Sequence, residues 1–126
     1  MMRRGSLAFA VVLLAGLLPA SAQDASKGEA VFKRCRACHA IGPAAQNKAG
    51  PALTGIVGKK AASVPGFNYS EAMTEAAAAG LVWTEPKLVA FLAAPDSFVP
   101  NNVMAFPGIK NPAELNDLIA FLKLHK

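Results

Sequence analysis

The stretch FKRCRACHAIG, residues 32–42, holds both cysteines of the chain, and one of its two histidines follows them directly. Two thiols and an imidazole this close together can form a disulfide or a redox pair, bind zinc, or attach a haem. A disulfide between Cys35 and Cys38 would close a very small loop and remove little entropy from the unfolded chain. A thioredoxin-like pair needs a βαβ setting, which this sequence lacks. A structural zinc site needs four ligands, and the other histidine, His125, lies one residue from the C-terminus.

The spacing C-x-x-C-H favours haem, because it is itself the attachment signature of haem c. Two thiols on one helical turn can reach the two vinyl groups along one haem edge, and His39 then projects its imidazole toward the iron. An iron that only passes electrons needs a second axial ligand, for which Met104 and Met73 are the candidates. Met104 lies in an irregular segment between two prolines, whereas inward packing is the simpler role for Met73 on its alanine-rich helix. A His/Met ligand pair raises the potential of the iron.

The N-terminus has the order of parts of a secretory signal peptide. Two arginines precede an apolar run over residues 7–18, and the small-x-small sequence ASA follows at residues 20–22. The apolar run is well short of the roughly 20 residues that span a bilayer, so a membrane anchor is disfavoured. The paired arginines also permit twin-arginine export. We predict a cleaved signal peptide over residues 1–22, a mature domain over residues 23–126 and a periplasmic location.

The mature chain has the size of one small domain and a mildly basic charge. Of the formal net charge of +5, two charges belong to the arginines of the signal peptide, which leaves +3. The lysines and arginines are scattered through the chain rather than gathered in a run, so a nucleic-acid partner is not expected. This charge suits a positive docking patch for an acidic protein.

Capping residues mark four short helices. Asp24 begins the first, on which Gly28, Phe32 and Cys35 share one face. Ser70 and Thr84 cap the next two, which end at Gly80 and Pro95. In the last helix Asn111 is the cap and Pro112 the first residue, with Glu114 placed as in a capping box. An apolar stripe of this helix then faces the core: Leu115, Leu118, Ile119 and Leu122.

The rest of the mature chain is predicted to form long loops that pack around an apolar group. Residues 40–70 are rich in glycine and proline and show no sustained period, and a second irregular stretch covers residues 95–110. No segment alternates as a half-buried strand does, so the fold class is all-α, one domain with short helices and long loops. Seven apolar residues of these loops need a common surface to pack on, and a large flat cofactor would supply it: Leu53, Ile56, Val57, Phe67, Phe98, Val103 and Phe106.

Over nearly the whole mature chain, the sequence resembles class I cytochrome c of the mitochondrial and bacterial periplasmic type. The motifs that carry the resemblance stand in the family's order: CRACHAIG, AGPALTGIVGKKA, VPGFNYSEAM, GLVWTE, FVPNNVMAFPGIK and LNDLIAFLK. It implies one haem c joined to Cys35 and Cys38, with His39 and Met104 as the iron ligands. The Pro51 carbonyl would accept the imidazole N–H.

The resemblance further implies that Tyr69 and Trp83 hydrogen-bond a haem propionate and that Lys59 lies near it. Asn102, in place of the usual threonine, could also bond a propionate. On the first helix Gly28 and Phe32 should cross Leu118 and Phe121 on the last. Two further residues depart from the family's pattern. Phe91 replaces a common tyrosine and cannot donate a hydrogen bond near the methionine sulfur, and Met73 replaces a common asparagine.

The function implied is that of a soluble, monomeric one-electron carrier, not an enzyme. Its expected partners are acidic redox proteins: a membrane oxidase, a bc-type complex, a reaction centre or a dehydrogenase. No nucleic-acid partner and no permanent membrane anchor are expected. Two alternatives remain open, a cytochrome subunit dedicated to one periplasmic dehydrogenase and a haem enzyme with an open distal site. A rim of positive side chains around the haem edge would steer docking: Lys33, Arg36, Lys48, Lys59, Lys60 and Lys110.

Overall fold

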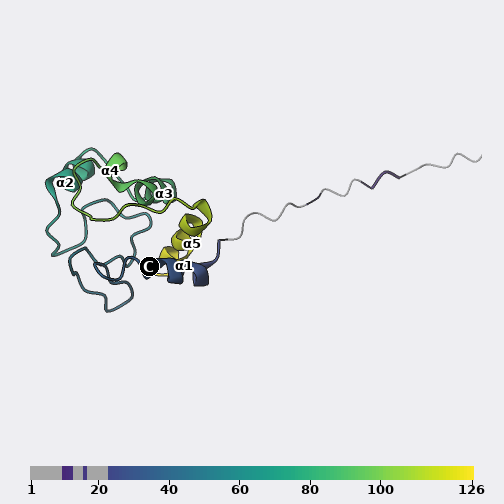
Figure 1. The fold of residues 1–126 in the computed structure, drawn as a ribbon, viewed down its shortest axis with the longest axis horizontal. Coiled ribbons are helices and arrows are strands. Elements are labelled where there is room, and N and C mark those ends of the chain that lie inside the picture. The colour runs from purple at the N-terminus through teal and green to yellow at the C-terminus, as the bar shows by residue number, and fades with distance from the viewer. Residues whose placement is uncertain (1–9, 13–15, 17–22) are drawn as a thin grey trace, which may run out of the picture.

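The fold is helical, with long connecting segments (Figure 1). The structure is a computed structural model and describes residues 10–12, 16 and 23–126. The signal peptide predicted over residues 1–22 therefore lies almost entirely outside the described residues, and the predicted domain boundary stays a prediction. Within the described part of the chain there is no strand, and the single ladder contact is an isolated antiparallel bridge between Lys60 and Val82. The described residues form five helices: α1 (Ala25–Phe32), α2 (Glu71–Ala78), α3 (Glu85–Ala93), α4 (Pro95–Phe98) and α5 (Pro112–Lys123).

The capping residues chosen from the sequence begin the helices as predicted. The Asp24 side chain accepts hydrogen bonds from the backbone N–H groups of residues 26 and 27 and so starts α1. Ser70 and Thr84 each accept from the N–H three residues later, at the starts of α2 and α3. Asn111 accepts from the N–H of Ala113 at the start of α5. Each side chain satisfies donors that a helix N-terminus otherwise leaves without a partner.

Two local predictions were wrong. The stretch from Pro95 was expected to be irregular, but Pro95–Phe98 forms α4, one helical turn that only the non-helical Ala94 separates from α3. The proline that stops α3 is also the first residue of α4, a position where its fixed φ and missing N–H are tolerated. The capping box at the start of α5 does not form, because the hydrogen bonds of the Glu114 carboxylate go to Arg34 instead.

The first and last helices pack against each other, as the sequence predicted (Figure 1). Gly28 lies so close to the backbone carbonyl of Asp117 that a Cβ at this position would overlap it. The rings of Phe32 and Phe121 lie 5.2 Å apart between the same two helices. The backbone N–H of Asp24 donates to the Asp117 carboxylate at 2.9 Å. Glycine is therefore required at position 28 by the close approach of the two backbones.

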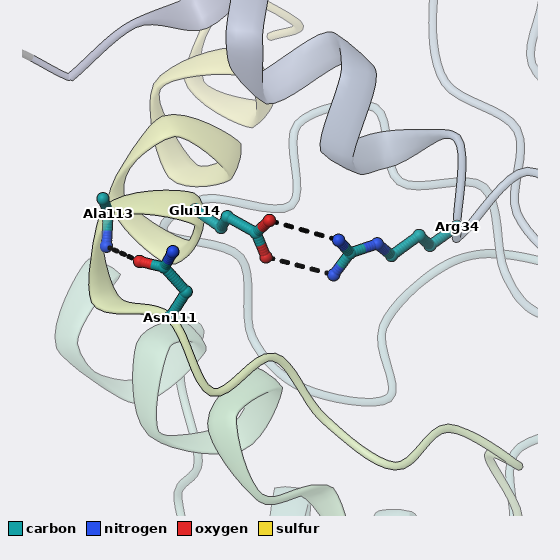
Figure 2. A network of polar contacts seen from close by, with 4 residues as sticks. All are labelled: Arg34, Asn111, Ala113 and Glu114. Carbon is teal, nitrogen blue, oxygen red and sulfur yellow. Dashed lines mark hydrogen bonds and ion pairs between the residues drawn. The ribbon is translucent and has the colours of Figure 1, made fainter.

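An ion pair extends this contact beyond the end of α1 (Figure 2). Arg34 lies in the run of turns that follows α1, and its guanidinium faces the Glu114 carboxylate in the first turn of α5. The bonds from Nη1 to Oε2 and from Nη2 to Oε1 measure 3.1 and 3.2 Å. This fork geometry fixes the orientation of both groups. The turns at residues 33–38 are thus held against α5 as well as being continuous with α1.

Buried side chains from α1, α3 and α5 form one core with residues of the irregular segments. The largest fully buried side chains include Phe32, Ile109 and Leu118. No helix among the described residues is long and apolar enough to cross a membrane. Many other residues of the long irregular segments line a cavity beside this core.

Candidate haem-binding cavity

The described residues enclose a cavity of about 440 Å³ that is lined mainly by apolar side chains. The two cysteines of the attachment motif, His39 and Met104 all line this one cavity. Of the seven apolar loop residues that were expected to pack on a cofactor, five line it as well: Leu53, Ile56, Phe67, Val103 and Phe106. The sequence correctly predicted that the loops enclose a shared apolar space.

The attachment motif lies in consecutive turns just after α1. The backbone N–H groups of Cys38 and His39 both donate to the carbonyl of Cys35, at 3.1 and 2.9 Å. Both cysteines are free thiols, with Cys35 half-buried and Cys38 exposed. Burial raises the pKa of the Cys35 thiol, and the nearby charges of Arg34 and Arg36 partly oppose this. Both thiols are thus presented to one side of a single turn, next to the cavity.

His39 is oriented by a backbone carbonyl. Its Nδ1 lies 2.7 Å from the carbonyl oxygen of Pro51. Because a carbonyl oxygen only accepts, Nδ1 carries the hydrogen of the neutral ring and Nε2 keeps its lone pair. Burial lowers the pKa of His39, with the bond to Pro51 acting the other way and the charge of Lys48 adding to the decrease. Burial thus favours the neutral ring, and the Pro51 bond selects the tautomer that a metal ligand requires.

Gly50 makes room for this imidazole. It is buried, and a Cβ added to it would overlap the His39 ring, at 2.8 Å from Nδ1. Its own N–H donates to the carbonyl of Cys38 at 2.8 Å. The absence of a side chain at Gly50 thus lets the segment before Pro51 lie flat against the ring. Sequence reasoning did not single out this residue, and its place one position before Pro51 is the signal that could have identified it.

Met104 lies in a segment without regular secondary structure, which we call the methionine loop, residues 99–110. The side-chain oxygen of Asn102 accepts from the backbone N–H of Met104 at 2.9 Å, and Phe106 N–H donates to the Met104 carbonyl at 2.9 Å. The exposure of side chains alternates along this stretch, with Val103 81% exposed and Met104 and Phe106 half-buried. The alternation is typical of an extended backbone.

Two of the residues that depart from the family's pattern, Phe91 and Met73, lie on the cavity wall. Phe91 is buried and packs against Trp83 and Phe98, with ring centroids 5.0 and 6.2 Å away. Met73 is half-buried on α2 and, like Phe91, lines the cavity. Both positions are therefore part of the apolar wall, as the simpler packing interpretation of Met73 predicted.

The residues expected near a propionate also line the cavity. The Tyr69 hydroxyl accepts from the Val64 N–H at 3.0 Å, so its own hydrogen remains available for donation. Burial raises the pKa of this hydroxyl. Trp83 is buried, and within the described part of the chain no hydrogen bond engages its indole N–H. Lys59 Nζ donates to the carbonyl of Thr54 at 3.3 Å. These side chains bring polar hydrogens to an otherwise apolar wall.

Asn102 has a geometry that the sequence did not predict. Its Nδ2 donates to the Asp96 carboxylate at 3.1 Å and to the Val99 carbonyl at 2.9 Å. Both amide hydrogens are then used, while Oδ1 holds the Met104 N–H. In this arrangement Asn102 organises the methionine loop, and a hydrogen bond to a propionate would require one of these bonds to break.

Some of the rim residues have structural partners. Lys48 Nζ donates to the carbonyl of Arg36 at 2.7 Å, and Lys110 Nζ donates to the carbonyl of Ala93 at 2.5 Å, at the end of α3. Lys110 therefore satisfies a carbonyl that the helix C-terminus leaves without an intrahelical partner. Of the other four rim residues, Arg36 pairs with Glu29 at 4.0 Å and Lys59 bonds the Thr54 carbonyl. Lys33 and Lys60 are exposed.

The cavity fits a haem by its chemistry. An apolar wall matches the porphyrin faces, and two adjacent thiols match its two vinyl groups. A neutral imidazole and a thioether supply one nitrogen and one sulfur donor to the same space. Among the described residues, no group of three or more His, Cys, Asp or Glu side chains is placed to hold a metal ion by itself.

Comparison with known proteins agrees with this chemistry. The family model described as cytochrome c matches residues 25–126. A cytochrome c2 of Agrobacterium tumefaciens (strain II Chrys) is 56% identical over 99 residues, which cover 79% of this chain and 89% of the relative. A cytochrome c2 of Blastochloris viridis is 43% identical over 112 residues, covering 89% and 86%.

Solved structures give the same result for the fold. The structure of cytochrome c2 from Rhodospirillum centenum superposes with a TM-score of 0.78 at 39% identity and covers 82% of this chain and 98% of that one. Cytochrome cH from Methylobacterium extorquens gives a TM-score of 0.73 at 40% identity, covering 80% and 98%.

Proposed function

Because this chain belongs to the cytochrome c family, we propose that it carries single electrons between redox proteins through one covalently attached haem c. The observation that carries the proposal is that Cys35, Cys38, His39 and Met104 share one apolar cavity. When bound, the haem iron supplies the one-electron chemistry by alternating between its ferric and ferrous states. The chain itself holds the group, orients its ligands and keeps water away from it.

The attachment turn and the methionine loop supply the direct contacts. Cys35 and Cys38 would hold the haem through two thioethers, and His39 and Met104 would ligate its iron. The assignment of His39 is supported by the Pro51 bond, since that bond leaves Nε2 with its lone pair toward the ligand side of the ring. The assignment of Met104 is supported by its half-buried position on the wall of the same cavity.

Four further residues set the surroundings of the haem. Tyr69 and Trp83 each offer one polar hydrogen at the cavity wall and are suited to a propionate, with Lys59 beside them as a positive charge. Asn102 acts through the loop that carries the methionine, by accepting a hydrogen bond from the Met104 N–H. The apolar wall lowers the local polarity, which favours the ferrous state together with the soft thioether ligand.

The expected partners are acidic redox proteins. The net charge of +3 on the mature chain supports a positive docking surface, in which Lys33 and Lys60 are the exposed members with no hydrogen bond or ion pair of their side chains among the described residues. A membrane oxidase, a bc-type complex, a reaction centre or a dehydrogenase would each fit this description. We place the protein in the periplasm, exported by the signal peptide of residues 1–22.

An absorption spectrum tests the proposal. The oxidised holoprotein should show the weak red band expected for methionine–Fe(III) ligation in this family, and Met104→Ala should abolish it. Met73→Leu is the matched control, since Met73 is the other methionine on the cavity wall and should leave the band in place. A native protein that lacks the band and binds carbon monoxide readily when reduced would instead be a haem protein with an open distal site.

A further inference from the structure

Within the described part of the chain, the Asn102 side chain connects the Met104 backbone to α4. Met104 belongs to an extended segment, so its backbone has no helical or strand partner. Its N–H is held by Asn102 Oδ1, while the amide of Asn102 is anchored at α4 through Asp96 and at the end of α4 through Val99. One side chain therefore makes three hydrogen bonds, all of them within the methionine loop and the helix directly before it.

The backbone directs Asn102 into this position. The chain turns back after α4, where Asn101 adopts the left-handed conformation with φ of 64°. The N–H of Asn102 then donates to the carbonyl of Val99 at 3.1 Å. Both the backbone and the side chain of Asn102 thus close onto the end of α4. Asparagine is among the few residues other than glycine that adopt this conformation readily, which suits Asn101 to the turn.

Two acceptors, the Asp96 carboxylate and the Val99 carbonyl, fix which way the Asn102 amide faces. An amide can be rotated so that its oxygen and nitrogen exchange places. In the rotated orientation Asn102 Oδ1 would face the carboxylate oxygen of Asp96, and its NH₂ would face the N–H of Met104. The first contact would pair two acceptors and the second two donors, so both are repulsive. Asp96 therefore favours the orientation in which the oxygen is presented to the methionine.

We propose that Asn102 is a positioning residue for the axial ligand Met104 and that Asp96 holds Asn102 in the required orientation. The proposal rests on the function proposed above, in which Met104 binds the iron. A fixed Met104 backbone leaves the side chain little freedom to leave the iron. Loss of the Asn102 bond should then allow a competing ligand to displace the methionine more easily, since a typical net hydrogen bond corresponds to a factor of about five to ten.

The experiment measures the affinity of exogenous imidazole for the oxidised holoprotein, followed through loss of the red methionine band. Asn102→Ala should raise the affinity about five- to tenfold. Asp96→Ala should raise it by a smaller factor, because it removes only one of the two acceptors that orient the amide and leaves the Val99 carbonyl. Asp96→Asn should restore a value near that of the native protein, since its side-chain oxygen can still accept from Asn102. Ser97→Ala is the matched control, because Ser97 is exposed in the same helix and has no side-chain hydrogen bond to a described residue.

The outcomes separate the two proposals. A native protein without the methionine band overturns the ligation by Met104 itself. A native band together with an imidazole affinity that Asn102→Ala leaves unchanged overturns the positioning role alone. An unchanged affinity in Asp96→Ala overturns the orienting role of Asp96. Global unfolding in denaturant is measured for every variant. If the imidazole affinity rises in proportion to the loss of global stability in all variants, Ser97→Ala included, a specific effect on Met104 is contradicted.

Discussion

Arg34 and Glu114 face each other through two parallel hydrogen bonds, although 80 positions separate them in the sequence. Arg34 directly precedes the first cysteine of the attachment turn, and Glu114 lies in the first turn of α5 (Figure 2). The pair therefore ties the position of the attachment turn to the last helix. This link is independent of the contact between α1 and α5 themselves.

Arg34→Lys should lower the free energy of unfolding by about 0.5–1 kcal/mol, because lysine cannot form the two parallel bonds and both partners are partly exposed. Arg36→Lys is the comparison variant, since Arg36 meets Glu29 only at 4.0 Å and its other contact, over the Phe32 ring at 5.0 Å, is one that a lysine can also make. Denaturant unfolding at low and high salt measures both. The difference between the two variants should shrink in high salt, and equal losses at both salt concentrations would contradict an electrostatic origin.

Gly50→Ala should destabilise the holoprotein by about 1–3 kcal/mol, the usual range for an overpacked site. The added methyl group would overlap the His39 ring, so either the ring or the segment before Pro51 must shift. The bond from Nδ1 to the Pro51 carbonyl should weaken, which NMR can detect through the exchange rate of the Nδ1 hydrogen. Ala49→Ser provides the control at an exposed neighbour, and an unchanged exchange rate in Gly50→Ala would count against the close packing.

Lys110→Met should act on stability rather than on docking. Its ammonium group caps the carbonyl of Ala93 at the end of α3, so its loss should cost about 1 kcal/mol. Lys60→Met removes the same charge from an exposed site, where we expect little change in stability but slower association with an acidic redox partner at low salt. Unfolding and stopped-flow kinetics compare the two. If Lys110→Met instead slowed association and Lys60→Met lowered stability, Lys110 would belong to the docking surface and not to the cap of α3.

The stability contributed by the Asp24 carboxylate should depend on pH. The hydrogen bond from the Ser26 hydroxyl, followed by that from the Lys27 backbone, lowers the pKa of Asp24 below its ordinary value of 3.8. A carboxyl with a lowered folded pKa stabilises the fold above its unfolded pKa, and this contribution is lost as pH falls through the folded pKa. The advantage of the native protein over Asp24→Asn should therefore be present at neutral pH and disappear in acid.

NMR titration of the Asp24 carboxyl provides the second measurement. In Ser26→Ala the largest cause of the decrease is removed, so the pKa of Asp24 should rise toward its ordinary value. Thr74→Ala is a control, because its hydroxyl bonds the carbonyl of Ser70 at the start of another helix. A titration of Asp24 that Ser26→Ala does not move would refute the assigned cause.

Features set by neighbours in the sequence were predictable, and those set by distant contacts were not. Asp24, Ser70, Thr84 and Asn111 begin helices because each side chain meets N–H groups two or three residues away. The attachment motif followed from the same kind of local pattern, Met104 from its place between two prolines and the cavity from the apolar residues of the loops, with the resemblance adding Pro51.

Three features required the folded structure. The four residues of α4 are too few to show a helical period, and no side chain caps them. Glu114 matches a local capping pattern, but a guanidinium from another part of the chain engages its carboxylate. Lys110 has the appearance of a surface charge, and only the return of the chain to α3 places it at the carbonyl of Ala93. Local pattern carries no information about such partners.

The contact of Asp24 with Asp117 joins positions 93 residues apart and so makes the domain a closed ring of chain. Closing a ring of that size costs on the order of 4 kcal/mol of entropy, but the cost grows only with the logarithm of its length. An insertion of five residues in one of the connecting segments would add less than about 0.1 kcal/mol. The contact between Asp24 and Asp117 therefore places almost no limit on the length of segments that lie away from the cavity wall. A deletion that reached α5 would instead open the ring altogether.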